Sequence, residues 1–490
     1  MRSSLKVIFI MFLLFLPSVL VVHLGIIDGN YLSIISKQIL NTIIIVTSVV
    51  VITTSLGVLT AWIFALYNFP LKRYLEIILI LGMVFPSYVL ALFYSETFKV
   101  WGEIALIGTL SVSTLPYVFM IVTMSLRSQS QQLVDTALML GKNNHWIKLK
   151  VIWPLLKPAI VLSSLLVLGD TFSEFGATYF YGVDTIMTGI YEIWFGLHEI
   201  EQGIRFASWT FIITLSIYYF INTWKHSMIG HQPSLSNSGT FQTIQSENLS
   251  GIKGFIISLF IISITLITFF IPFGVLGMWV VAEYTDTDWW RVIAVTLNSS
   301  MLATVIAMLV LINTTFILYL FKKRIPYIMS LSNTLYSTPG IILAVAAVYV
   351  INATHLEVGG ILFIYVLTLK YLAMGTDSIG VGIQKVNRQY YYTTKTFGKD
   401  SVWYIWKIQI PMSMQSYLIA GILVWIDVIR ELVIGLTLRP QWLDLLSVEI
   451  FRYMDMEQLS MSGPWILAMV IITIIPIYYI KIIINCQHCF

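Results

Sequence analysis

Long apolar runs without charged side chains alternate along the chain with short segments that hold most of its Lys, Arg, Asp and Glu residues. A helix needs about 20 consecutive apolar residues to cross a bilayer. Nine charge-free runs reach or approach this length, at residues 7–27, 38–71, 77–95, 104–126, 206–224, 254–282, 292–321, 325–355 and 459–480. Three further apolar stretches, residues 158–183, 358–376 and 408–438, hold isolated charges. The pattern predicts an all-α polytopic membrane protein with about twelve transmembrane helices.

The composition agrees with this pattern. Of the 490 residues 58% are hydrophobic and 11% are charged, whereas soluble domains carry roughly 25% charged residues. This balance excludes a soluble globular or disordered protein, and a net charge of +4 does not indicate a nucleic-acid partner. The cysteines, Cys486 and Cys489, lie with His488 at the end of the sequence, where we expect an unstructured tail rather than a metal site.

The basic residues predict the orientation, because Lys and Arg in short loops stay on the cytoplasmic side of a membrane. If the N-terminus lies in the cytoplasm, 20 of the 28 Lys and Arg residues fall on the cytoplasmic side. Both termini are then cytoplasmic. Residues 7–27 are too long for the apolar core of a signal peptide, and we interpret them as an uncleaved first span.

A polar segment rich in Ser, Asn and Gln, residues 226–252, divides the predicted helices into six and six. We interpret it as a cytoplasmic linker. The predicted first repeat is residues 1–225, with its core at 38–224. The predicted second repeat is residues 253–490, with its core at 292–484.

An internal repeat supports this division. A shift of 257 residues superposes similar residues at four separate places in the two halves. The four places are Thr42 with Ser299, the loop in which Gly141 and Pro154 align with Gly398 and Pro411, Asp170 with Asp427, and Glu174 with Glu431. Because six helices separate the copies, we expect two parallel repeats related by an axis along the membrane normal.

Each copy of the repeat contains the same loop. The first copy holds Asp135-Thr136-Ala137, Gly141 and then Val151-Ile152-Trp153-Pro154, and the second holds Tyr392-Thr393-Thr394, Gly398 and then Ile408-Gln409-Ile410-Pro411. We expect a short helix that ends at the Gly, which tolerates a positive φ. The alternative is a plain connection between two spans.

This loop resembles the signature loop of binding-protein-dependent ABC importer permeases, and the whole chain resembles two such permeases fused. The resemblance implies a type I importer fold in which the short helix docks on an ATP-hydrolysing subunit. The ATPase-coupling residues that it implies are Asp135, Ala137, Gly141, Pro154, Gly398 and Pro411. The second copy departs from the family pattern at Tyr392, where an acidic residue is usual.

Further stretches are similar to ferric-iron permeases of the two-in-one type. They are residues 170–176, Tyr181-Gly182, residues 427–432, Phe85-Pro86-Ser87 and Thr338-Pro339-Gly340. This resemblance implies ferric iron as the cargo. Fused permeases for thiamine, phosphonate or another small solute share much of the same pattern, so these cargoes stay open.

Four carboxylates fall within predicted spans, where an ionisable group costs roughly 2.5–3.5 kcal/mol. They are Asp170, Glu174, Asp427 and Glu431. The i,i+4 spacing predicts that each pair shares one helix face. One hypothesis is an acidic translocation path, because hard cations prefer oxygen ligands. The alternative is that these carboxylates pair with Arg430 or Lys370, or lie in the wet periplasmic vestibule and hold the gate. No residue is predicted as a resident metal ligand.

The sequence therefore predicts the permease subunit of an ATP-driven ABC importer in the bacterial inner membrane. It is not predicted to be an enzyme or to hold a cofactor, because it lacks a Gly-x4-Gly-Lys-Ser/Thr phosphate loop. The expected partners are an ABC ATPase subunit in two copies, a periplasmic substrate-binding protein and the lipid bilayer. An ion-coupled secondary transporter that uses the intramembrane carboxylates is the alternative from another class.

The binding protein is expected to dock on two outside loops, Val183–Gly203 and Arg439–Ser462. Their acidic residues are Asp184, Glu192, Glu199, Glu201, Asp444, Glu449, Asp455 and Glu457.

Overall fold

The computed structural model describes residues 13–485, apart from residues 14, 26, 128–130, 230–246, 250, 322–323 and 355–358. Most of the predicted linker, and the tail with Cys486 and Cys489, lie outside the described residues. The chain folds into two compact units. Unit 1 consists of Met1–Leu32, Ile190–Ser216 and Ala282–Phe490, and unit 2 consists of Ser33–Gly189 and Ile217–Val281.

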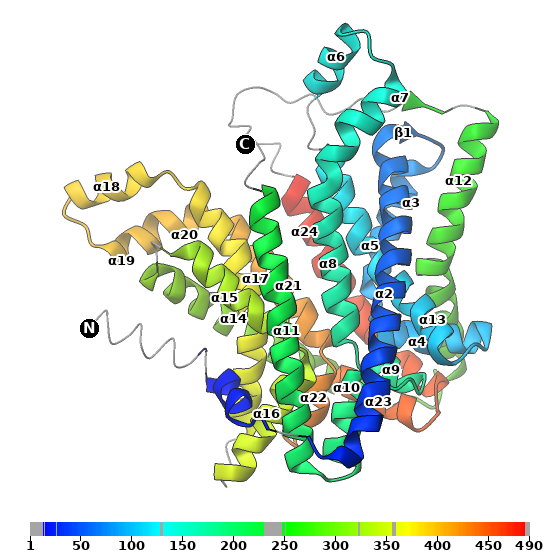
Figure 1. Ribbon diagram of the computed structural model, residues 1–490, viewed down its shortest axis with the longest axis vertical. Coiled ribbons are helices and arrows are strands. Elements are labelled where there is room, and N and C mark those ends of the chain that lie inside the picture. The colour runs from blue at the N-terminus through cyan, green and yellow to red at the C-terminus, as the bar shows by residue number, and fades with distance from the viewer. Residues whose placement is uncertain are drawn as a thin grey trace. The chain divides into compact units, whose positions relative to one another are not determined.

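Helices make up almost all of the regular structure (Figure 1). The helices up to the linker are α2 (Gly29–Leu66), α3 (Lys72–Leu81), α4 (Ser87–Phe98), α5 (Gly102–Arg127), α6 (Gln131–Met139), α7 (Asn144–Ile147), α8 (Trp153–Ser173), α9 (Gly176–Phe180), α10 (Ile186–Tyr191) and α11 (Ile200–Ile229). The helices after it are α12 (Ile252–Thr265), α13 (Ile271–Ala282), α14 (Trp289–Leu320), α15 (Ile325–Tyr336), α16 (Gly340–Thr354), α17 (Gly359–Lys385), α18 (Arg388–Thr396), α19 (Ser401–Tyr404), α20 (Ile410–Met412), α21 (Met414–Arg430), α22 (Val433–Leu438), α23 (Leu446–Asp455) and α24 (Gly463–Asn485). Two short strands, β1 (Tyr67–Asn68) and β2 (Glu247–Asn248), pair in parallel within unit 2.

Six helices of the described chain are long and apolar enough to cross a membrane, and three bent helix pairs raise this number to nine. These nine fall on nine of the predicted spans. The other three predictions are residues 7–27, 206–224 and 459–480, the last of which coincides with the shorter apolar helix Ser460–Pro476. The all-helical polytopic membrane fold is therefore confirmed, and the number twelve stays a prediction.

Two of the bends follow a proline. The axis turns by 104° between Lys72–Val84 and Ser87–Phe98, and by 87° between Ile328–Tyr336 and Gly340–Thr354. Pro86 and Pro339 stand directly before the second helix of each pair. Proline lacks a backbone N–H and suits the start of a helix, so each apolar run is interrupted without any charged residue.

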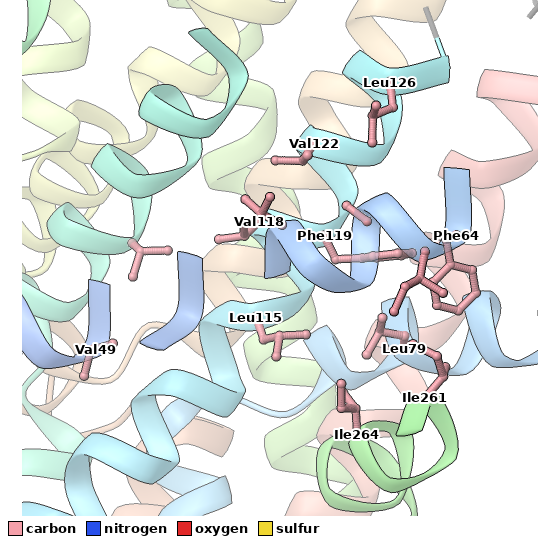
Figure 2. Close-up of a cluster of buried hydrophobic side chains, with 14 of the residues drawn as sticks. Val49, Phe64, Leu79, Leu115, Val118, Phe119, Val122, Leu126, Ile261 and Ile264 are labelled. Atoms are coloured by element: carbon pink, nitrogen blue, oxygen red, sulfur yellow. The ribbon is translucent and has the colours of Figure 1, made fainter. Parts of the chain in front are cut away.

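Helix α12 lies in unit 2 although it begins the predicted second repeat. Figure 2 shows Ile261 and Ile264 of α12 in the buried cluster with Leu79, Leu115 and other side chains of α2, α3 and α5. The hydroxyl of Tyr94 in α4 also donates to the backbone oxygen of Ile267, at 2.8 Å. The start of the predicted second repeat therefore packs on helices of the first.

The converse exchange occurs in unit 1. The ring of His23 packs edge-on against Tyr349 of α16, with centroids 4.3 Å apart. Phe15 meets Tyr365 of α17 in the same way, at 6.5 Å. Each compact unit thus combines the main helices of one sequence half with the first helix of the other half, and unit 1 also contains Ile190–Ser216 of the first half.

The two long helices α2 and α14 each cross a partner at a glycine. A Cβ placed on Gly57 of α2 would lie 2.6 Å from Val118 of α5. A Cβ placed on Gly375 of α17 would lie 2.4 Å from the hydroxyl of Thr314 in α14. Small residues at membrane helix crossings let the backbones approach closely. Both positions correspond at the shift of 257 residues, so the halves share one crossing but place its glycine on opposite helices.

Candidate functional site

The loop after α6 is closed by a glycine in the left-handed region. Gly141 has φ 71°. Its N–H donates to the carbonyl oxygen of Leu138 at 2.9 Å, and the N–H of Lys142 donates to that of Ala137 at 3.1 Å. These two bonds form a Schellman motif, which ends a helix by satisfying its last carbonyl groups. The predicted break of the short helix at Gly141 is confirmed.

The loop after α18 has the same geometry. Gly398 has φ 69°. Its N–H donates to the carbonyl oxygen of Lys395 at 3.0 Å, and the N–H of Lys399 donates to that of Thr394 at 3.2 Å. Thr394 is buried at the position where the first loop has the buried Ala137. The departure of the second copy from the family pattern therefore leaves the backbone of this loop unchanged.

The segments that follow the two glycines also match residue by residue. Asn143 caps α7 by accepting the N–H of Trp146 at 2.8 Å, and Asp400 caps α19 by accepting that of Trp403 at 3.4 Å. A π-helical turn then covers Lys148–Ile152 in the first loop and Ile405–Gln409 in the second, at the same shift of 257 residues. Pro154 and Pro411 lie near the start of the helices that follow these turns.

Large apolar side chains on both loops face outward. We call Leu140, Trp146 and Leu149 the first loop surface, and their counterparts Phe397, Trp403 and Trp406 the second loop surface. All six are exposed, between 39% for Trp403 and 77% for Phe397. Within each unit the short helices extend beyond the helix bundle, α6 past the end of α8 and α18 past α15 and α17 (Figure 1). Apolar side chains that lie on a loop rather than along a membrane span are suited to a contact with another protein.

The structure places Glu174 after the end of a helix rather than within one. Helix α8 ends at Ser173, and Glu174 has an extended backbone with φ −70° and ψ 127°. Its Oε1 accepts the backbone N–H of Ala177 in α9 at 2.9 Å, and its Oε2 accepts the hydroxyl of Ser87 at 2.6 Å. Glu174 therefore caps the short helix that follows.

Glu431 occupies the equivalent place in the second half. Helix α21 ends at Arg430, and Glu431 is extended with φ −66° and ψ 115°. Its Oε1 accepts the N–H of Ile434 in α22 at 3.4 Å. Its Oε2 accepts the ammonium of Lys370 at 2.6 Å and the hydroxyl of Tyr371 at 2.7 Å. The side chain of Glu431 is 9% exposed and that of Lys370 is 16% exposed.

One expectation about the carboxylates needs correction. The extended residues Glu174 and Glu431 interrupt the predicted spans, so neither glutamate shares a helix face with the aspartate four residues earlier. Asp170 is exposed and Asp427 is half-buried. Among the described residues, no group of three or more His, Cys, Asp and Glu side chains could hold a metal ion.

The aspartate-glutamate pairs belong to different units: Asp170 and Glu174 to unit 2, Asp427 and Glu431 to unit 1. A passage that they share stays a prediction.

A pair of hydroxyls, Thr42 and Ser299, has a structural role that the sequence reasoning did not assign. Thr42 accepts the backbone N–H of Ile186 at 2.9 Å, at the start of α10. Ser299 accepts that of Leu446 at 2.9 Å, at the start of α23. The available signal was the alignment of these two residues in the repeat. Each hydroxyl holds the start of one predicted outside loop against a long helix.

One acidic residue expected to meet the binding protein is turned inward. The side chain of Glu449 in α23 is only 2% exposed and lies 2.6 Å from Arg452 and 3.6 Å from Arg291. A buried carboxylate needs such partners. Glu449 is therefore removed from the predicted docking surface, and it lies within ion-pair distance of Arg291 at the beginning of α14.

Comparison with known proteins gives two matches. Residues 53–224 match the family described as binding-protein-dependent transport system inner membrane component. The chain is also 23% identical over 466 residues to a protein of Haemophilus influenzae named Fe(3+)-transport system permease protein FbpB 2. This alignment covers 90% of the chain and 88% of that relative, so it extends into both halves of the chain.

Proposed function

We propose that this chain, whose residues 53–224 belong to the inner-membrane components of binding-protein-dependent transport systems, is the permease subunit of an ATP-driven importer of ferric iron. Members of this family are transport subunits rather than enzymes. They work with an ATPase subunit and with a periplasmic binding protein that delivers the cargo. A multi-pass helical protein agrees with this role.

The observation that carries the cargo assignment is the length of the similarity to the Haemophilus influenzae protein. It extends over 90% of the chain and is not confined to the family segment. The relative is named for transport of Fe(3+). The proposal for iron rests on this likeness.

The similarity of the two loops supports the proposal that two ATPase subunits bind, one at each loop surface. Both loops hold a Schellman glycine, a capped short helix, a π-helical turn and exposed tryptophan at corresponding positions. We place these loops and both termini in the cytoplasm, because most Lys and Arg residues fall on that side. The predicted coupling residues, from Asp135 to Pro411, lie in these loops.

The carboxylates divide into two roles. Asp170 and Asp427 lie in helices and are proposed to face the passing cation, for which carboxylate oxygens are suitable ligands. Glu174 and Glu431 have a structural role, because each caps the short helix that follows it, α9 or α22. Replacing both aspartates by Asn should lower iron uptake more than the ATPase rate. Unchanged uptake in that double variant would remove the aspartates from the path.

Reconstitution tests the function as a whole. The chain is placed in liposomes with its ATPase subunit inside and iron-loaded binding protein outside. Uptake of radioactive iron is then measured with ATP and with a non-hydrolysable analogue. We expect uptake that needs both ATP and the binding protein, and an ATPase subunit that copurifies with the chain. Iron uptake driven by an ion gradient without the ATPase would instead establish the secondary-transporter alternative.

A further inference from the structure

The two helix breaks at Glu174 and Glu431 are built in the same way. In each, a long helix ends, the glutamate is extended, and its Oε1 accepts the N–H three residues later. A helix start inside a bilayer exposes N–H groups that water cannot satisfy, and this is costly. A carboxylate supplies a strong acceptor at that place. The breaks therefore give both glutamates a structural reason to lie within membrane segments.

The partner of the carboxylate differs between the two breaks. Ser87 and Gly340 each begin a helix directly after a proline. Ser87 donates its hydroxyl to Glu174. At Gly340 a Cβ would lie 3.0 Å from Oε1 of Glu431 and 3.1 Å from Nζ of Lys370. The absence of a side chain at residue 340 thus makes room for an ammonium group beside the carboxylate.

Both capped breaks lie at the far end of a helix that starts near a loop surface. Helix α8 runs from the first loop, at Trp153, to Ser173, which is 21 residues and therefore about 30 Å at 1.5 Å per residue. Helix α21 runs from Met414, shortly after the second loop, to Arg430. Lys148–Ser173 is one continuous span, so a movement of the first loop is carried along it to Glu174. Between the second loop and α21 the axis turns by 77° at Ser413, so a movement of that loop reaches Glu431 through this bend.

We propose that Glu174 and Glu431 are positioning residues that fix the short helices α9 and α22 to the ends of α8 and α21, and that Lys370 neutralises Glu431 in this role. Neither glutamate is a ligand of the cargo. The fixed breaks make the short helices move together with the loops, so ATP hydrolysis is coupled to opening of the passage. This inference rests on the proposed importer function for its coupling part, and on the contacts alone for its structural part.

Removal of the ammonium is the first perturbation. Lys370→Met leaves the carboxylate of Glu431 in the protein interior without its positive partner. The unpaired charge destabilises the contact between the end of α21 and the start of α22. Lys370→Met combined with Glu431→Gln removes both charges, while the amide oxygen of Gln still accepts the N–H of Ile434. Lys99→Met is the matched control, because the Lys99–Glu96 pair is exposed and should contribute little.

The readout is the number of ATP molecules hydrolysed per iron transported in the reconstituted complex. Partial unfolding lowers the rates of ATP hydrolysis and of iron transport together and leaves this ratio unchanged. A helix break that no longer holds α22 to the end of α21 raises the ratio. We expect the ratio to rise at least about threefold in Lys370→Met and to return to within about twofold of wild type in the double variant. A double variant as uncoupled as the single one would overturn the proposal, because the charge of Glu431 would then act on the cargo.

A second measurement keeps this result separate from the importer assignment. Amide hydrogen exchange at Val433–Leu438 is followed in the full chain in nanodiscs, without ATPase or iron. We expect exchange about tenfold faster in Lys370→Met and near wild type in the double variant and in Lys99→Met. Unchanged exchange in Lys370→Met overturns the role of the pair. If exchange is faster in Lys370→Met and restored in the double variant, but the wild type shows no ATP-dependent iron uptake, only the proposed function is overturned.

Discussion

The two loop glycines allow a test of backbone conformation that side-chain packing does not complicate. Gly141 and Gly398 have φ of 71° and 69°, and a Cβ at either would meet nothing within 4 Å. Replacing Gly398 by Asn, Ala and Val therefore changes only the cost of the left-handed conformation. The same series at Gly141 tests the first loop.

The expected magnitudes follow from that cost. The left-handed region costs an ordinary L-residue about 1–2 kcal/mol, and Asn adopts it more readily than Ala. A β-branched residue such as Val is strained further. If the ATPase subunit binds only the native loop, its apparent affinity falls in proportion to the population of that loop. Gly398→Ala should therefore weaken binding by up to roughly 5- to 30-fold, Gly398→Asn less, and Gly398→Val more.

The assay is a titration of labelled ATPase subunit onto the chain in nanodiscs. Gly277→Ala is the control, because Gly277 lies within helix α13 and a Cβ there also meets nothing within 4 Å. It should bind like the wild type. The reasoning is refuted if Asn weakens binding as much as Val, or if the whole series behaves like Gly277→Ala.

Three further predictions concern packing and polar contacts. Gly375→Ala should destabilise unit 1, because its Cβ would lie 2.4 Å from the Thr314 hydroxyl and 2.9 Å from Cγ1 of Val310. Adding Thr314→Gly, which copies the glycine placement of the other half, should recover only part of the midpoint in a thermal unfolding assay, because the contact with Val310 remains. Thr42→Val should lower the free energy of unfolding by about 1–3 kcal/mol, because the N–H of Ile186 loses its acceptor, and Thr42→Ser should lower it less. Equal unfolding midpoints for the Val and Ser variants would contradict this prediction. Glu449→Gln should lower the free energy of unfolding by about 1 kcal/mol, less than the loss of a fully buried ion pair, because Arg291 and Arg452 are 45% and 38% exposed and stay solvated without the carboxylate. An unfolding midpoint equal to that of the wild type would show that its arginines do not need the charge.

The features that could be predicted from the sequence are those set by neighbouring residues. Charge-free runs of bilayer length are sufficient to predict membrane helices, because the lipid environment selects them by composition alone. A glycine between a short helix and a proline, repeated 257 residues later, indicated both loops. The φ values of Gly141 and Gly398 confirm the predicted breaks. These properties are local, so the linear pattern contains them.

The roles of the intramembrane carboxylates depended on tertiary structure. From the sequence, Glu174 and Glu431 were charges in apolar runs, and a cation path and a gate were both reasonable. In the structure each carboxylate accepts the N–H three residues later and also meets a side chain far along the chain: Ser87 is 87 residues from Glu174, and Lys370 is 61 residues from Glu431. The sequence offered Lys370 and Arg430 as possible partners, and only the tertiary structure decided that Glu431 meets Lys370 and that Glu174 meets Ser87.

Tertiary packing also decided which helices belong together. The polar linker and the repeat predict two halves, but the two compact units exchange the first helix of each half, and Ile190–Ser216 of the first half also belongs to unit 1. In a bilayer an apolar helix gains little by hiding from lipid, so association depends on close backbone packing and polar contacts. Hydropathy determines that Ile261 and Ile264 lie in a membrane helix. Only the shape of the cluster around Leu79 and Leu115 determines where that helix packs.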